Sequence, residues 1–164
     1  MAIANAIHKL SDFVNKICCV LCVIILVSMV VVTGMQIVCR LLFTALTWSE
    51  EVTRYLLVWS TFIGAGIVYK ASGHISVTLV QDCCPAMVQK LLKLVVHIIC
   101  FAFCAATVYF GFKYMNMQGK QLSAALRIPM KYMYMAIPIC GIIIDIHALD
   151  AIVSMFTKKE GEAA

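Results

Sequence analysis

The chain has 164 residues, of which 63% are hydrophobic and 13% charged, and its mean hydropathy is +0.99. Soluble domains are about half apolar and a quarter charged, so this composition excludes a water-soluble domain and indicates an integral membrane protein. The formal net charge of +5 comes without a basic cluster interleaved with aromatic residues, which excludes nucleic-acid binding and fits lipid head groups.

The first predicted element is an amphipathic helix over residues 2–16, where apolar and polar side chains alternate at helical spacing. It lies either in the membrane surface or at the wetted start of the first span. Residues 17–38 follow without a charged side chain, bracketed by Lys16 and Arg40, and they are long enough to cross a bilayer. We therefore expect the first transmembrane helix at 17–38.

The second predicted span, 48–69, begins with charged residues. Thr47 stands three residues before Glu50, the spacing of a capping box, and predicts a helix start. Glu50 and Glu51 lie four and three residues before Arg54, so either carboxylate can pair with its guanidinium on a helix, or the charges can bind a partner protein.

Small residues within the second span predict close helix packing. Ser60 and Gly64 form a small-xxx-small pair, and Gly66 adds a second gap on the helix surface. In lipid, such residues let another helix backbone approach closely.

The second half of the chain predicts two more spans. After Pro85, residues 86–93 form a short amphipathic segment expected along the head groups, and residues 94–112 form the third span. The fourth span is expected at 130–156, with Pro129 in its first turn and a kink at Pro138, which lacks a backbone N–H. The chain is thus predicted to be one all-α membrane domain over residues 1–164.

Polar residues in the last two spans leave two other functions open. His97 and His147 on neighbouring helices have the residue type that ligates a b-type haem in membrane anchors of redox complexes, or each is a hydrogen-bonded helix histidine. Asp145 and Asp150 suit a proton or cation relay in an autonomous small transporter. Phosphate-binding glycine loops and hydrolase motifs are missing from the sequence, so it does not predict an enzyme.

One stretch resembles a known family. The sequence WSEEVTRYLLVWSTFIGAGIVYKASGHISVTLV, which opens at Trp48, is similar to the signature of the small membrane subunit of tripartite ATP-independent periplasmic (TRAP) transporters, the DctQ-like family. The segment IPMKYMYMAIPICG resembles the family's last helix. The residues that carry the resemblance are Trp48, Glu50, Glu51, Arg54, Trp59, Gly64, Gly73, His74, Ile75, Pro129 and Pro138. Together with the small-residue pattern of the second span, they give the predicted structural or partner-interface set: Trp48, Glu50, Glu51, Arg54, Trp59, Ser60, Gly64, Gly66, His74, Pro129 and Pro138.

The resemblance implies a scaffold role in a secondary transporter. A periplasmic substrate-binding protein would capture an organic acid such as a dicarboxylate, sialic acid or sugar acid. A large DctM-like membrane subunit would carry it inward with sodium, and the sodium would bind that subunit, so we expect no cofactor, metal or substrate site here. The small subunit would brace the large one among the phospholipids of the bacterial inner membrane.

The distribution of positive charge bears on orientation. Seven Lys and Arg residues fall in the terminal segments and the middle loop, and six fall in the other two loops. Positive residues are enriched in cytoplasmic loops, so this small difference predicts that both termini are cytoplasmic.

Overall fold

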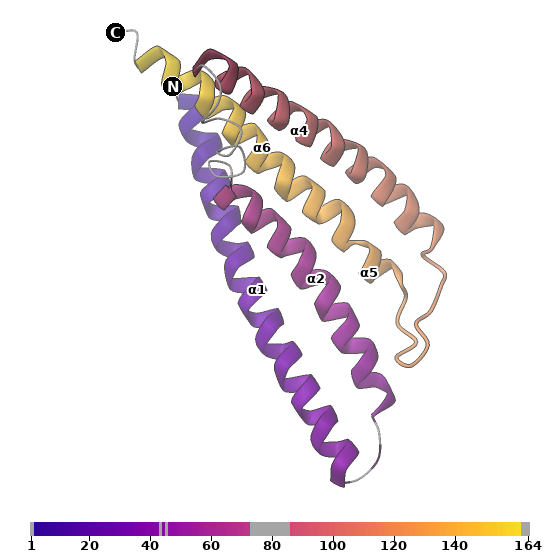
Figure 1. Ribbon diagram of the computed structural model, residues 1–164. Helices are drawn as coiled ribbons and strands as arrows, with labels where there is room; N and C mark the ends of the chain where they lie inside the picture. The colour runs from indigo at the N-terminus through magenta and orange to yellow at the C-terminus, as the bar shows by residue number, and fades with distance from the viewer. Residues whose placement is uncertain (1, 43, 45, 73–85, 162–164) are drawn as a thin grey trace.

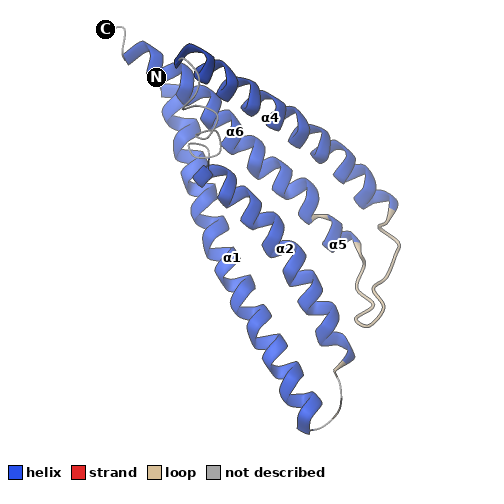
Figure 2. Cartoon of the chain, in the orientation of Figure 1, coloured by secondary structure: helices blue, strands red, loops and turns tan. Residues whose placement is uncertain are grey.

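The computed structural model describes residues 2–42, 44, 46–72 and 86–161 of the chain. Its helices are α1 (Ala2–Leu42), α2 (Thr47–Ser72), α4 (Ala86–Met117), α5 (Lys131–Tyr134) and α6 (Ala136–Gly161). The described residues contain four helical segments long and apolar enough to cross a membrane, with α5 and α6 together making the fourth. Figures 1 and 2 show the described chain as helices joined by loops, so the predicted all-α membrane fold is confirmed.

The helices run alternately up and down, and α6 is central to their packing. Helix α1 packs along α2, α4 packs along α6, and α6 also contacts both α1 and α2. Figure 1 shows the start of α1 and the last turns of α6 at the same end of the molecule. A chain that crosses the bilayer four times begins and ends on the same side, so the four predicted spans require α1 to start where α6 ends.

The predicted amphipathic segments are not separate helices. Residues 2–16 form the first turns of α1, and residues 86–93 form the first turns of α4. The helices continue because residues 2–33 and 86–110 contain neither glycine nor proline, the residues that interrupt helical hydrogen bonding most often. At 1.5 Å per residue, the 41 residues of α1 extend about 62 Å, twice the thickness of a bilayer core.

The fourth span is interrupted as Pro138 predicts, but the break falls at Met135. Pro138 has no N–H to donate to the Tyr134 carbonyl four residues before it, so α5 ends there. The Ile139 N–H donates to the Met135 carbonyl at 3.3 Å and carries the chain into α6. The prediction that Pro129 lies in the first helical turn is wrong. Pro129 precedes α5 and pairs with Leu122 across a bridge, because the connecting hairpin extends to this residue.

The bundle core is small and is built partly from cysteine. Cys18 of α1, Ile63 of α2 and Cys140 of α6 form one buried cluster, and Trp59 and Ile143 pack against it. A thiol in such a place acts as a small apolar group.

Glycines set the separation of α4 and α6. A Cβ atom added at Gly141 would lie 2.6 Å from Cγ2 of Val108, and one at Gly111 would lie 3.1 Å from Cδ of Pro138. Both positions require hydrogen in place of a side chain, so α4 approaches the backbone of α6 directly.

Candidate functional site

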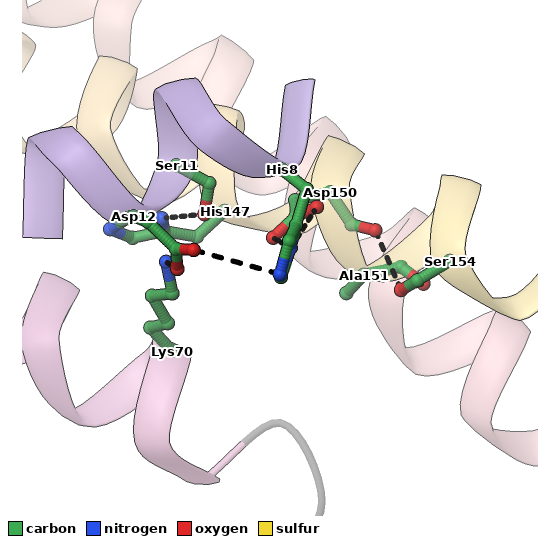
Figure 3. A network of polar contacts seen from close by, with 8 residues as sticks. All are labelled: His8, Ser11, Asp12, Lys70, His147, Asp150, Ala151 and Ser154. Carbon is green, nitrogen blue, oxygen red and sulfur yellow. Dashed lines mark hydrogen bonds and ion pairs between the residues drawn. The ribbon is translucent and has the colours of Figure 1, made fainter. Parts of the chain in front are cut away.

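Three helices meet at a group of polar side chains near the start of α1, the end of α2 and the second half of α6 (Figure 3). We call this group the polar junction. Its members are His8, Ser11, Asp12, Lys70, His147 and Asp150.

One lysine–aspartate ion pair, one imidazole–carboxylate contact and one hydroxyl–imidazole hydrogen bond link the three helices at the polar junction. Lys70 Nζ of α2 lies 2.5 Å from Asp12 Oδ1 of α1, and His8 Nδ1 lies 3.2 Å from Asp150 Oδ1 of α6. Ser11 Oγ and His147 Nδ1 are joined at 2.9 Å. Helix α1 is therefore tied to both α2 and α6 at the same level.

The polar junction is buried on its inner side. Ser11 and His147 are 0% and 3% exposed, whereas the His8 side chain is 62% exposed. The second ring nitrogen of His147, Nε2, is buried without a hydrogen-bond partner among the described residues, and so is Oδ1 of Asp145. Asp150 and His147 thus face protein, as their cost in a membrane helix predicts.

Helix lengths place the polar junction at one boundary of the bilayer. From Trp48 to Lys70, α2 rises about 33 Å, and from Lys93 to Lys113, α4 rises about 30 Å, close to the thickness of a hydrocarbon core. Because the helices run alternately up and down (Figure 1), we infer that Lys70 and Lys93 lie toward one boundary and that Trp48 and Lys113 lie toward the other. Because the charged groups that link the helices lie near the first boundary, they do not incur the free-energy cost of a charge at the centre of the bilayer.

A second tie lies at the other boundary, between α2 and the hairpin of residues 118–130. The Glu51 carboxylate accepts hydrogen bonds from the backbone N–H groups of Ala125 and Leu126, both at 2.9 Å, and from the Tyr55 hydroxyl. We call these four residues the hairpin clamp. A carboxylate that accepts two backbone N–H bonds makes charge-assisted bonds, roughly twice as strong as neutral ones.

The predicted pairing of Glu50 or Glu51 with Arg54 is wrong within the described part of the chain. Glu51 turns to the hairpin, and Glu50 Oε1 accepts from Gln36 Nε2 of α1 at 3.3 Å. Arg54 is exposed and joins neither carboxylate in an ion pair. Backbone N–H groups brought by the hairpin outcompete the exposed guanidinium, because an exposed pair contributes at most about 1 kcal/mol.

The small residues of α2 behave unequally. A Cβ atom at Gly66 would lie 3.0 Å from Cγ2 of Ile143 on α6, whereas one at Gly64 would meet nothing within 4 Å. Ser60 is buried and its hydroxyl donates to the Leu57 carbonyl. Gly66 is therefore the close-approach residue, and the predicted Ser60–Gly64 pair is not.

The remaining predicted residues lie apart from the polar junction. Trp48 is half-buried at the start of α2, Trp59 packs against the core cluster, and Pro138 is buried against Gly111. Pro129 is exposed in the hairpin. His74 lies outside the described residues.

The two histidines of the haem hypothesis make separate hydrogen bonds. His97 Nδ1 of α4 lies 2.8 Å from the Tyr69 hydroxyl of α2, and His147 Nδ1 bonds Ser11 of α1. Both rings are buried, and each is held by a different helix. This arrangement favours the reading of each as a hydrogen-bonded helix histidine.

Sequence reasoning missed most of the polar junction. His8 and Asp12 stood out only on the polar side of an amphipathic segment, Ser11 did not stand out, and Lys70 stood out only as the first residue of a polar connection. The signal present was their position, since Lys70 lies one residue after the predicted span 48–69 and the other three lie within nine residues before the predicted span 17–38. The partners of His8 and Ser11 on α6 are more than 130 residues away in sequence, and Asp12 and Lys70 are 58 residues apart, distances over which periodicity carries no information.

Comparison with known proteins identifies a family whose sequences match most of this chain. The family described as "Tripartite ATP-independent periplasmic transporters, DctQ component" matches residues 29–158. The match begins within α1 and ends near the end of α6, so it includes the later part of the first span and the whole of the other three.

Two relatives that align over most of both chains are described as small permease proteins of TRAP transporters. The chain is 25% identical over 148 residues to a putative TRAP transporter small permease protein of Haemophilus influenzae, covering 90% of this chain and 92% of that protein. It is 24% identical to the sialic acid TRAP transporter small permease protein SiaQ of Vibrio cholerae, covering 91% and 87%. It is also 28% identical over 98 residues to the isethionate TRAP transporter permease protein DctMQ of Oleidesulfovibrio alaskensis, covering 58% of this chain and 15% of that longer protein.

Proposed function

This chain belongs to the DctQ component family of TRAP transporters, and we propose that, as the small permease subunit, it braces the large membrane subunit of a sodium-driven importer. The imported solute is an organic acid, the class to which dicarboxylates, sialic acid and sugar acids belong. The complex sits in the bacterial inner membrane with both termini of this chain in the cytoplasm, and a periplasmic substrate-binding protein delivers the solute.

The observation that carries the proposal is how the charges of this chain are used. At one boundary the polar junction ties three helices together, and at the other the hairpin clamp ties the hairpin to α2. Charged and polar side chains that bind neighbouring helices suit a rigid support. A transport path instead needs polar side chains that face a solute. The long apolar outer faces of α1 and α4 remain for lipid and for a partner.

A large membrane partner is supported by the relatives. In the DctMQ protein, the similar segment is 15% of one long permease polypeptide, so a DctQ-like segment there is joined covalently to a much larger one. We propose the corresponding non-covalent contact for this chain, with Arg54 near it. Arg54 is an exposed cation at the bilayer boundary that pairs with neither neighbouring carboxylate.

The first experiment tests the contact. The chain and its large DctM-like subunit are expressed together, and an affinity tag on this chain recovers the complex. Arg54→Glu is expected to reduce the recovered large subunit at least several-fold, and Arg54→Lys is expected to retain it. Arg40→Glu reverses another exposed charge near the same boundary and is the matched control. Full recovery with Arg54→Glu would remove Arg54 from the contact.

The second experiment tests the scaffold role. Proteoliposomes that contain this chain alone are expected to take up no labelled organic acid. Those with both membrane subunits and the binding protein are expected to take it up in response to an inward sodium gradient. Uptake by the chain alone would show an autonomous transporter, and a Soret band in the purified chain would show a haem-bearing anchor. Either result overturns the proposal.

A further inference from the structure

A groove on the outer side of α4 and α6 is not used by the scaffold function. It has a volume of about 680 Å³, within the size range of small-molecule sites. Its walls are mainly apolar side chains of α4, and Ile137 of α6 completes them where the two helices are in contact. Figure 1 shows α4 and α6 side by side along this stretch. The rings of Phe103 and Phe110 are 69% and 61% exposed, so the groove opens outward to the bilayer.

The groove is lined by α4 from Phe103 to Met117, and its part from Phe103 to Lys113 matches one leaflet in length. From Phe103 to Lys113, α4 rises about 15 Å, which is half of a hydrocarbon core of about 30 Å. Lys113 lies at the boundary marked by Trp48, so the groove runs from head-group level to the bilayer midplane. A lipid acyl chain has this extent and this apolar character.

The boundary end of the groove carries charge and is held rigid. Lys113 lines the groove and makes no ion pair with another described residue. Tyr114 beside it is fixed by an edge-to-face contact with Tyr134 of α5, with ring centroids 4.8 Å apart. A cation at head-group level next to an aromatic ring suits a head group that carries a negatively charged phosphate.

We propose that this groove binds one anionic phospholipid, with an acyl chain along Phe103, Ala106 and Phe110 and the phosphate at Lys113. The lipid fills the outer surface between α4 and α6, the two helices that Gly111 and Gly141 bring together. This site requires only that the chain be embedded in a bilayer. It therefore does not depend on the proposed Arg54 contact with the large subunit.

The test is a lipid titration of the delipidated full chain followed by native mass spectrometry. Phosphatidylglycerol is compared with phosphatidylcholine of the same acyl composition. The wild-type chain is expected to bind one phosphatidylglycerol several-fold more tightly than phosphatidylcholine. Lys113→Gln is expected to abolish this preference, a loss of about fivefold for a cation at the membrane surface. Lys113→Arg is expected to keep it.

A second pair of variants tests the apolar part. Ala106→Trp fills the groove and is expected to weaken the binding of both lipids, whereas Ala105→Trp adds the same ring to an exposed position of α4 outside the groove. Circular dichroism establishes that each variant is folded. Equal affinity of the wild type for the two lipids, unchanged preference in Lys113→Gln, or unchanged binding in Ala106→Trp would each overturn the proposal. Loss of the bound lipid on assembly with the large subunit would also overturn it, since the groove would then hold the partner.

Discussion

Ser11 is the residue on which the buried imidazole of His147 depends. The Ser11 hydroxyl holds Nδ1 at 2.9 Å, and Nε2 has no partner among the described residues. Ser11→Ala would leave both nitrogens of a buried ring unsatisfied, and such a loss costs about 1–3 kcal/mol. We therefore expect the free energy of unfolding, measured in mixed detergent micelles, to fall by about that amount.

Ser28→Ala provides the comparison on the same helix. The Ser28 hydroxyl donates to the Ile24 carbonyl within α1 and contacts no other helix by a hydrogen bond in the described chain. Its replacement should change the free energy of unfolding by no more than about 0.5 kcal/mol. Equal effects of the two substitutions would show that the bond to His147 does not stabilise the bundle.

Glu51 has a measurable effect on the hairpin that it binds. Glu51→Ala removes the acceptor of the Ala125 and Leu126 N–H groups, so these two amides should exchange with solvent deuterium at least about tenfold faster. Glu50→Ala removes a neighbouring carboxylate that bonds only Gln36 among the described residues, and it should leave both amides unchanged. Unchanged exchange in Glu51→Ala would mean that other contacts hold the hairpin.

The packing of α2 on α6 depends on one glycine of the two in its second half. Gly66→Leu would place a side chain where Cγ2 of Ile143 lies 3.0 Å from the added Cβ, so the helices must separate or Ile143 must move. Overpacking of this kind costs about 1–3 kcal/mol of unfolding free energy. Gly64→Leu adds the same side chain where nothing lies within 4 Å, and it should be neutral or stabilising because leucine favours helix. A larger loss at Gly64 than at Gly66 would contradict this assignment.

The existence of each helix was predictable, and its contacts were not. Length and apolar composition predict the spans at residues 17–38 and 94–112, and Pro138 predicts a break in the last span. Sequence alone could not show which of Gly64 and Gly66 allows close helix packing, since both are small residues within the same predicted span. Only the position of Ile143 on another helix distinguishes them, and a single sequence does not encode that position in any local pattern.

The two ties act on the molecule as a whole. The polar junction fixes α1 to α2 and α6 at one boundary, and the hairpin clamp fixes the other end of α2 to the connection between α4 and α5. Both use charged groups that sequence reasoning assigned elsewhere: Glu51 to Arg54, and Asp150 to a relay. A charged residue at the end of a span indicates that it binds another part of the protein. Which residue it binds depends on which helix ends lie together in the fold.

We predict the orientation of the whole chain from the shared end of α1 and α6 and from the distribution of positive charge. The terminal segments and the middle loop carry seven Lys and Arg against six in the other two loops, so the polar junction should face the cytoplasm. Green fluorescent protein fused after Ala164 should fluoresce, because it folds in the cytoplasm. Alkaline phosphatase inserted after Gly119 in the hairpin should be active, because it requires the periplasm. The reciprocal fusions are the controls and should be silent, and a reversed pattern would place the hairpin clamp on the cytoplasmic side.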